Sequence, residues 1–384
     1  MTNDIYAKCL GYARGVDTPC VVLDTEIVKN RFTTLQATML GAKIYYAVKA
    51  NPEEAFIKAL HERGSYFDVA SRYEIDQLLL LGVPAEKMSY GNTIKKEADS
   101  AYAFEKGVRL FTTDSLSDIE KLSRVAPGAS VVFRLLLTPR TEAAVPLTRK
   151  FGAEKEMVED LIVKSKDLGL DPVGVSFHVG SQQGDIFTWK EAIAEAKSVF
   201  DTSLQKGIRL SMLNLGGGLP AHYLHATPEV EEYAKEITTY LKESFGEDLP
   251  TIAIEPGRFI VGDAGILATE VVMVSKKSTD NHLRWVYIDA GKFGGLMESM
   301  DEAIKYSLLV ERGGEVLSGD ASEVILAGPT CDSADILYEK FKYTLPNDLK
   351  AGDRIYFLSA GAYTTSYSSV GFNGFPPLKS YVLD

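Results

Sequence analysis

Residues 44–52 read IYYAVKANP, an apolar run that places a single lysine, Lys49, directly before a turn. Short apolar runs rich in aromatic and β-branched residues and closed by proline are typical of strands. A lysine at the end of such a strand can point into a cleft, where desolvation of its ammonium group lowers its pKa. The neutral amine is a nucleophile toward carbonyl groups. A solvent-facing side chain is the alternative interpretation, because lysine often keeps its charge in water.

The strand pattern recurs along the chain and alternates with segments of helical period. We predict strands near residues 42–48, 65–69, 87–90, 108–112, 130–136, 172–178, 210–215 and 251–255. Helices are predicted between them, among others over residues 53–63, 72–81, 150–168 and 189–206. Eight strands alternating with helices indicate a closed parallel (β/α)8 barrel of the TIM type rather than an open sheet.

Chemically distinctive residues stand at the carboxyl ends of these predicted strands. They are Lys49 after the first strand, Asp68 ending the second, Arg134 late in the fifth, His178 ending the sixth, Gly216, Gly217 and Gly218 after the seventh, and Glu255 ending the eighth. Barrel enzymes build their active sites at this end of the strands. The sequence therefore predicts one site at one end of the barrel.

The character of the chain changes after Gly265 to short β-rich runs separated by turns, over residues 267–274, 285–288, 323–327 and 354–357. Residues 19–24 form a further strand-like run, which we expect to pair with that β-rich part. The predicted domains are a barrel over residues 28–264 and a β domain formed by residues 1–27 and 265–384.

Composition narrows the class of protein. The 384 residues are 45% hydrophobic and 24% charged, which is typical of globular chains, and no run approaches membrane-spanning length. A formal charge of -12 opposes a nucleic-acid partner and favours small cationic substrates. Cys9, Cys20 and Cys331 fit neither a disulfide framework nor a zinc site, and no export signal is apparent. We expect a cytoplasmic protein without a metal.

Several of the residues at the strand ends suit one cofactor. Three consecutive glycines free backbone N–H groups to face a phosphate, and Arg258 can add a cation. Glu255 can hold a protonated ring nitrogen, and His178 can lie flat on the ring. A lysine, a phosphate cradle and a carboxylate for a pyridinium together indicate pyridoxal phosphate. Taken singly, the same residues are also compatible with a tight turn, a Glu–Arg pair and a core histidine.

Seven motifs in order resemble those of the fold-type III pyridoxal-phosphate decarboxylases, in particular the group acting on ornithine and lysine. They are YAVKAN at 46–51, FDVAS at 67–71, SFHVGS at 176–181, GGG at 216–218, EPGR at 255–258, CD at 331–332 and GAY at 361–363. GKFGG at 291–295 and GFNGF at 371–375 favour the ornithine/lysine branch. The resemblance implies an alanine racemase-like architecture, with the barrel joined to a β-sandwich or Greek-key domain. It also implies a head-to-tail homodimer with shared active sites.

The resemblance further implies a role for each matching residue. Catalysis would involve Lys49, which would hold the cofactor covalently, His178, Glu255, and Cys331 from the other subunit. The cofactor would also contact Asp68, Glu74, Arg134, Ser181, Gly216, Gly217, Gly218, Gly257, Arg258 and Tyr363. The substrate would meet Asp332, Cys331, Glu298, Tyr363 and Phe372. Asp332 would bind the distal ammonium group.

These residues predict decarboxylation of a basic amino acid, with L-ornithine converted to putrescine in polyamine biosynthesis as the first expectation. A bifunctional lysine/ornithine decarboxylase is the alternative, since one methylene changes binding by only about 1–3 kcal/mol. Relatives that act on meso-diaminopimelate carry Cys-Glu-Ser where this chain has Cys331-Asp332-Ser333. A non-catalytic regulator that keeps the fold ranks below both.

Overall fold

The computed structural model describes residues 5–137, 143–145, 150–280 and 283–384. The chain forms two compact units. Residues 29–220 with 227–257 make the barrel unit, and residues 1–28 with 221–226 and 258–384 make the β unit.

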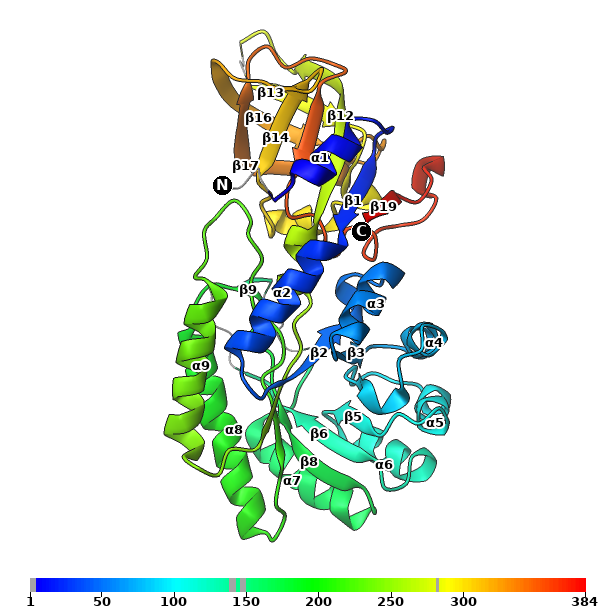
Figure 1. The fold of residues 1–384 in the computed structure, drawn as a ribbon, viewed down its shortest axis with the longest axis vertical. Helices are drawn as coiled ribbons and strands as arrows, with labels where there is room; N and C mark the ends of the chain where they lie inside the picture. Colours follow the sequence, from blue (N-terminus) through cyan, green and yellow to red (C-terminus); the bar gives the residue numbers. More distant parts are fainter. Residues whose placement is uncertain (1–4, 138–142, 146–149, 281–282) are drawn as a thin grey trace. The chain divides into compact units, whose positions relative to one another are not determined.

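The barrel unit contains a closed barrel of eight parallel strands, joined in the order β10-β11-β2-β3-β4-β5-β6-β8 (Figure 1). The strands are β2 Lys43–Ala47, β3 Tyr66–Val69, β4 Met88–Tyr90, β5 Leu110–Thr113, β6 Ser130–Arg134, β8 Asp171–Ser176, β10 Met212–Asn214 and β11 Thr251–Ile254. Each lies within one residue of a predicted range, so the predicted barrel is confirmed. Its strands are largely buried, as expected for parallel strands covered on both faces.

Helices follow these strands and surround the barrel (Figure 1). They are α3 Glu54–Glu62, α4 Arg72–Leu80, α5 Glu97–Glu105, α6 Leu116–Val125, α7 Lys155–Asp167, α8 Phe187–Gln205 and α9 Val230–Phe245. In α3, Phe56, Ile57 and Leu60 are buried at the spacing of one helical face. The hydroxyl of Ser71 caps α4 by accepting the Glu74 N–H at 3.4 Å.

One predicted helix is shorter than expected. The helix predicted over residues 150–168 begins at Lys155, because the residues before it pair with the end of β6. Ala153 donates its N–H to the Arg134 carbonyl at 2.9 Å and accepts the Leu136 N–H at the same distance. Gly152 makes this approach possible: its φ is +90°, and a Cβ there would lie 2.7 Å from the Leu135 carbonyl oxygen.

The β unit is built on a curled, mixed sheet of nine strands. They are β1 Cys20–Asp24, β12 Gly265–Lys276, β13 Arg284–Ile288, β14 Leu308–Arg312, β15 Glu315–Val316, β16 Ala321–Ala327, β17 Ile336–Pro346, β18 Arg354–Phe357 and β19 Lys379–Leu383. β1 pairs antiparallel with β12 and parallel with β19. The expectation that residues 19–24 join the β-rich part is therefore confirmed.

Further elements complete the two units. They are α1 Ala7–Ala13, α2 Thr25–Thr38, α10 Arg258–Val261 and the two-stranded sheet of β7 Ala143–Val145 and β9 Ser181–Gln183. Within the described residues, no helix has the combination of length and apolar composition needed to cross a membrane.

Residues 258–264 belong to the β unit, whereas the sequence analysis assigned them to the barrel. The reason is a close backbone contact. Gly361 donates its N–H to the Gly262 carbonyl at 2.9 Å, and a Cβ on Gly361 would lie 1.9 Å from the Val261 carbonyl oxygen. Only glycine at position 361 allows these two segments to meet.

Candidate active site

Lys49 lies in a short 3-10 turn, Val48–Ala50, at the carboxyl end of β2. Its Nζ donates to Asp68 Oδ2 at 2.8 Å, and Asp68 belongs to the neighbouring strand β3. The Lys49 side chain is half exposed while that of Asp68 is buried. The structure thus differs from the simple picture of a desolvated ammonium group, because the charge of Lys49 is balanced by a carboxylate.

Glu255 follows β11 and is held on both sides by the backbone. Its N–H donates to the Gly216 carbonyl at 2.8 Å, and the next carbonyl, that of Pro256, accepts the Ala47 N–H at 3.1 Å. Its carboxylate accepts a hydrogen bond from Asn214 Nδ2 at 2.6 Å. Burial, reinforced by the Asp68 carboxylate, raises the pKa of Glu255 to about 7. This carboxyl group is therefore poised to ionise when a cation approaches.

His178 follows β8 and is a neutral ring. Burial, followed by the positive charges of Arg134 and Lys49, holds the pKa of His178 well below its ordinary value. Its Nδ1 accepts the Gly180 N–H at 3.0 Å, so the ring proton resides on Nε2. A neutral imidazole can lie against an aromatic ring without adding a charge to it.

The three glycines form a close-packed backbone loop. Gly216 and Gly218 have φ values of +65° and +116°. A Cβ on Gly216 would lie 2.1 Å from the Phe177 carbonyl oxygen, and one on Gly217 would lie 3.1 Å from His178 Nε2. The Gly218 carbonyl accepts the Gln183 N–H at 3.0 Å, which ties this loop to β9 and to Ser181 at its start. The loop is therefore a bare backbone surface held beside the histidine.

Two further predicted residues, Glu74 and Arg134, lie near these side chains. Glu74 Oε2 accepts the Ala70 N–H at 2.6 Å, and burial raises the pKa of Glu74 although that hydrogen bond and Lys49 oppose the shift. Arg134 ends β6, lies over the ring of Phe151 and has a pKa lowered by burial, with Glu255 and Asp68 opposing this. These electrostatic effects show that the predicted residues gather at one end of the barrel.

In the β unit, Arg258 opens α10 directly after Gly257. Its guanidinium group is buried and bonds to both carboxylate oxygens of Glu298, at 2.7 and 2.5 Å. Tyr363 has a φ of +59°, and its ring centroid lies 4.9 Å from the Arg258 guanidinium carbon. The structure therefore gives Glu298, expected at the substrate, a protein cation as its partner.

Cys331 and Asp332 are both exposed on a turn of the β unit. The Cys331 N–H donates to Asn373 Oδ1 at 3.2 Å, and its Sγ lies 3.5 Å from the same oxygen. Asp332 accepts the Ala334 N–H at 2.8 Å and so begins a 3-10 turn. An exposed thiol beside an exposed carboxylate differs from the buried, inert cysteine that would otherwise be the usual expectation.

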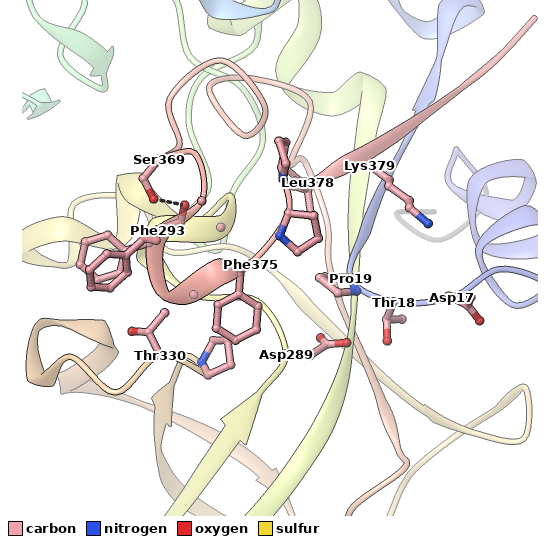
Figure 2. Close-up of a pocket in the computed structure, with 17 residues that line it drawn as sticks. Asp17, Thr18, Pro19, Asp289, Phe293, Thr330, Ser369, Phe375, Leu378 and Lys379 are labelled. Atoms are coloured by element: carbon pink, nitrogen blue, oxygen red, sulfur yellow. Dashed lines mark hydrogen bonds between the residues drawn. The ribbon is translucent and has the colours of Figure 1, made fainter.

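Phe372 lines a cavity of about 340 Å³ in the β unit, together with Thr330, the residue before Cys331. Figure 2 shows Phe375 between Phe293 and Pro19 along this cavity, with Asp289 close by. The rings of Phe293 and Phe372 are 4.6 Å apart, and the Ser369 N–H donates to the Phe293 carbonyl at 3.0 Å. The predicted substrate residue Phe372 therefore stands beside the turn that carries the thiol.

Comparison with known proteins agrees with this geometry. Residues 25–262 match the family model described as pyridoxal-dependent decarboxylase, pyridoxal binding domain. The lysine/ornithine decarboxylase of Selenomonas ruminantium is 32% identical over 94% of this chain and 89% of its own length.

The chain belongs to this family.

Solved structures extend the likeness to nearly the whole decarboxylase. A complex of a double mutant of SrLDC, the Selenomonas ruminantium lysine decarboxylase, with PLP has a TM-score of 0.87 and 31% identity, covering 97% of this chain and 94% of that one. The Vibrio vulnificus lysine/ornithine decarboxylase complexed with putrescine has a TM-score of 0.86 and 26% identity over 100% and 99%. The arginine decarboxylase of Paramecium bursaria Chlorella virus, bound to agmatine, has a TM-score of 0.88 and 27% identity, covering 99% of this chain and 100% of that one.

The residues of this decarboxylase fit its cofactor, pyridoxal phosphate. Lys49 supplies an amine, His178 a neutral ring, and Glu255 a carboxyl group that a cationic ring nitrogen would ionise. In the glycine loop the Gly216 N–H is taken by Asn214, so the N–H groups of Gly217 and Gly218 are the ones offered to a phosphate, at positions where any side chain would clash. Arg258 Nε is buried and has no hydrogen-bond partner among the described residues, which suits it to an oxyanion. Those residues also contain no cluster able to hold a metal ion.

The sequence analysis did not select three residues that the structure brings to notice. Asn214 ends β10 and joins Glu255 to the glycine loop, because its Oδ1 also accepts the Gly216 N–H at 2.9 Å. A polar residue between a strand and three glycines was its signal. Asp335 is buried below Cys331, and Asp301 is exposed with a φ of +54° in the kinked segment Met297–Glu302. Neither has a local signal beyond being a carboxylate near a motif.

Proposed function

We propose that this protein decarboxylates L-ornithine to putrescine, as a step of polyamine biosynthesis. Membership of the family makes it a pyridoxal-phosphate-dependent decarboxylase of a basic amino acid. The observation that carries the finer proposal is the exposed carboxylate of Asp332 next to the exposed thiol of Cys331. A carboxylate at this place suits a substrate with a distal ammonium group, because opposite charges attract across a short distance.

The residues at the barrel end have distinct tasks in this reaction. When bound, pyridoxal phosphate supplies an electron-accepting ring for the electron pair left by departing carbon dioxide. Ionised Glu255 would keep a proton on the ring nitrogen, and Asn214 holds the carboxylate in place. His178 would cover one face of the ring as a neutral group. Lys49 would hold the cofactor and give way to the substrate amine.

Proton return is assigned to Cys331, whose Sγ would deliver a proton to Cα of the substrate. The turn that carries it is held from below by the buried carboxylate of Asp335. That carboxylate accepts hydrogen bonds from the Thr330 hydroxyl at 2.7 Å and from the Lys292 N–H at 2.7 Å. The thiol is thereby presented on a fixed turn rather than on a loose loop.

The proposed active site is shared between two copies of the chain, with Cys331 and Asp332 reaching the partner's barrel. The resemblance to the family supports this arrangement, and the exposure of both side chains allows it. Mixing inactive Lys49→Ala protein with Cys331→Ala protein, which should form amine only slowly, and measuring amine release tests it. Random exchange of subunits should restore about a quarter of the wild-type activity, since half the dimers would contain one intact site of two. No recovery after verified exchange would contradict a shared site.

A bifunctional lysine/ornithine decarboxylase is the second candidate. The names of the Selenomonas and Vibrio relatives favour it, and the two substrates differ by one methylene. The decisive experiment offers L-ornithine, L-lysine, L-arginine and meso-diaminopimelate in parallel to the loaded enzyme and measures amine and carbon dioxide. Putrescine alone supports ornithine decarboxylation, and comparable cadaverine supports the bifunctional enzyme. Release from none of the four would refute both.

We expect the enzyme to act in the cytoplasm. All three of its cysteines are free, and Cys9 and Cys20 are buried. Free thiols are typical of reducing compartments.

A further inference from the structure

Arg258 and Glu298 form a buried pair whose geometry is unusually complete. Arg258 Nη1 donates to Glu298 Oε2 at 2.7 Å and Nη2 donates to Glu298 Oε1 at 2.5 Å. The side chains are only 5% and 9% exposed. Nη1 also donates to the Tyr223 hydroxyl at 2.8 Å. Both terminal nitrogens of the guanidinium group therefore bond to Glu298, and Nη1 bonds to Tyr223 as well.

The hydrogen bonds to Glu298 and Tyr223 do not use all the N–H donors of Arg258. A guanidinium group has five N–H donors in a planar fork. Glu298 takes one from each terminal nitrogen, and Tyr223 takes the second from Nη1. The N–H of Nε and the second N–H of Nη2 are left, and they lie on the same edge of the fork. Nε is buried and without a partner in the part of the chain that the structure describes.

A free edge with two parallel N–H groups matches two oxygens of a phosphate. The ring of Tyr363 lies against the guanidinium at 4.9 Å, and the Tyr223 ring is itself packed edge-on against Tyr306. The fork therefore cannot rotate freely to offer another edge. A buried donor left unpaired is costly, so the arrangement is best understood as prepared for an anion.

We propose that Glu298 is a positioning residue for the cofactor phosphate: it holds Arg258 so that the Nε–Nη2 edge meets that phosphate in a two-pronged hydrogen bond. Both oxygens of Glu298 are engaged by Arg258, so this role replaces the expectation that Glu298 binds the substrate ammonium. The inference rests on the family's cofactor and not on the identity of the substrate.

If Glu298 only balances the charge of Arg258, removing its charge should change the affinity for the cofactor in the opposite direction. A carboxylate near an anion repels it, so removing that negative charge would tighten phosphate binding. If orientation dominates, the same change loosens binding, because the freed guanidinium spends most of its time in other rotamers. The direction of the change in cofactor affinity thus separates the two roles.

The test compares Glu298→Gln and Glu298→Asp with the wild-type holoenzyme. The measurements are the rate at which pyridoxal phosphate leaves the diluted holoenzyme and the ³¹P chemical shift of the bound phosphate. We expect Glu298→Gln to speed release by tenfold or more and to move the ³¹P signal. Glu298→Asp keeps the charge but is too short for the same grip, so it should also speed release. Tyr223→Phe removes only the flanking acceptor and should have a smaller effect in the same direction.

The chain offers a matched control. Arg14 also forms a two-bonded pair with a buried glutamate of the β unit, Glu311, from Nε at 2.9 Å and Nη2 at 2.6 Å, but Arg14 itself is 43% exposed. Glu311→Gln removes the same charge from an arginine–glutamate pair, so it should lower stability without changing cofactor release or the ³¹P signal. An equal change in both variants would reduce Glu298 to a structural residue. Slower release from Glu298→Gln, or wild-type release from both Glu298 variants, would overturn the proposal.

Discussion

The pKa of Glu255 supplies a quantitative prediction about the cofactor-depleted protein. Burial raises that pKa from 4.5 to about 7. At 1.36 kcal/mol for each pKa unit, ionising this group in the folded protein costs about 3 kcal/mol. The stabilising effect of the protonated group is fully present below pH 4.5 and is lost as the pH rises through 7. Most of that loss, about 2–3 kcal/mol, falls between pH 5 and pH 8.

The perturbation is Glu255→Gln, which keeps the shape of the side chain and cannot ionise. The free energy of unfolding of both proteins is measured in urea at pH 5 and pH 8 after the cofactor has been removed. We expect the wild type to lose about 2–3 kcal/mol relative to Glu255→Gln between the two pH values. The control is Glu243→Gln on α9, a change of the same chemistry in an exposed pair with Lys190 of α8, and it should show no such difference.

A wild-type and Glu255→Gln difference that is the same at both pH values would refute the reasoning. It would mean that Glu255 in the folded protein does not change its ionisation between pH 5 and pH 8. The infrared band of a protonated carboxyl group gives an independent check. That band should be present in the wild type at pH 6, absent from Glu255→Gln, and lost when the cofactor binds.

Four further predictions concern other residues. Lys49→Ala should abolish turnover and the cofactor's absorbance band, and unchanged turnover would sink its assignment. Cys331→Ala should retain the cofactor, slow proton return and give less than one amine for each carbon dioxide, whereas a ratio of one at wild-type rate would exclude the thiol as donor. Asp335→Asn should lower kcat about tenfold or more while cofactor release stays unchanged, because only the Cys331 turn loosens. Lys95→Met leaves buried Asp118 with Lys121 as its one remaining ion-pair partner among the described residues, and should cost about 1–3 kcal/mol of stability by urea unfolding, with activity per folded molecule retained.

The strands of the barrel and the residues at their ends could be predicted because each signal is local. An apolar run shows a strand whatever its partner is, and a parallel barrel places every residue that follows a strand at the same end. Lys49, His178, the glycine loop and Glu255 were found in this way. The exact start of α7 could not be predicted, because the residues before it pair with the end of β6 and that pairing does not alter the helical period of the sequence.

Contacts between residues far apart in the sequence could not be predicted either. Glu298 was selected as a carboxylate near a motif, but its partner Arg258 is a consequence of how the β unit folds. The same holds for Asp335, which joins the loops at Lys292 and Thr330. The sequence does not indicate which group a carboxylate will contact in the folded protein.

The sequence by itself determined the order of strands and helices, the family and the set of groups proposed to contact the cofactor, because these depend on residue type and spacing along the chain. Only the tertiary structure decided the state of those groups. The neutral ring of His178, the raised pKa of Glu255 and the edge of Arg258 that has no partner among the described residues all arise from burial and from neighbours distant in sequence. Desolvation and charge depend on three-dimensional distance, and the linear chain does not contain that distance until it folds.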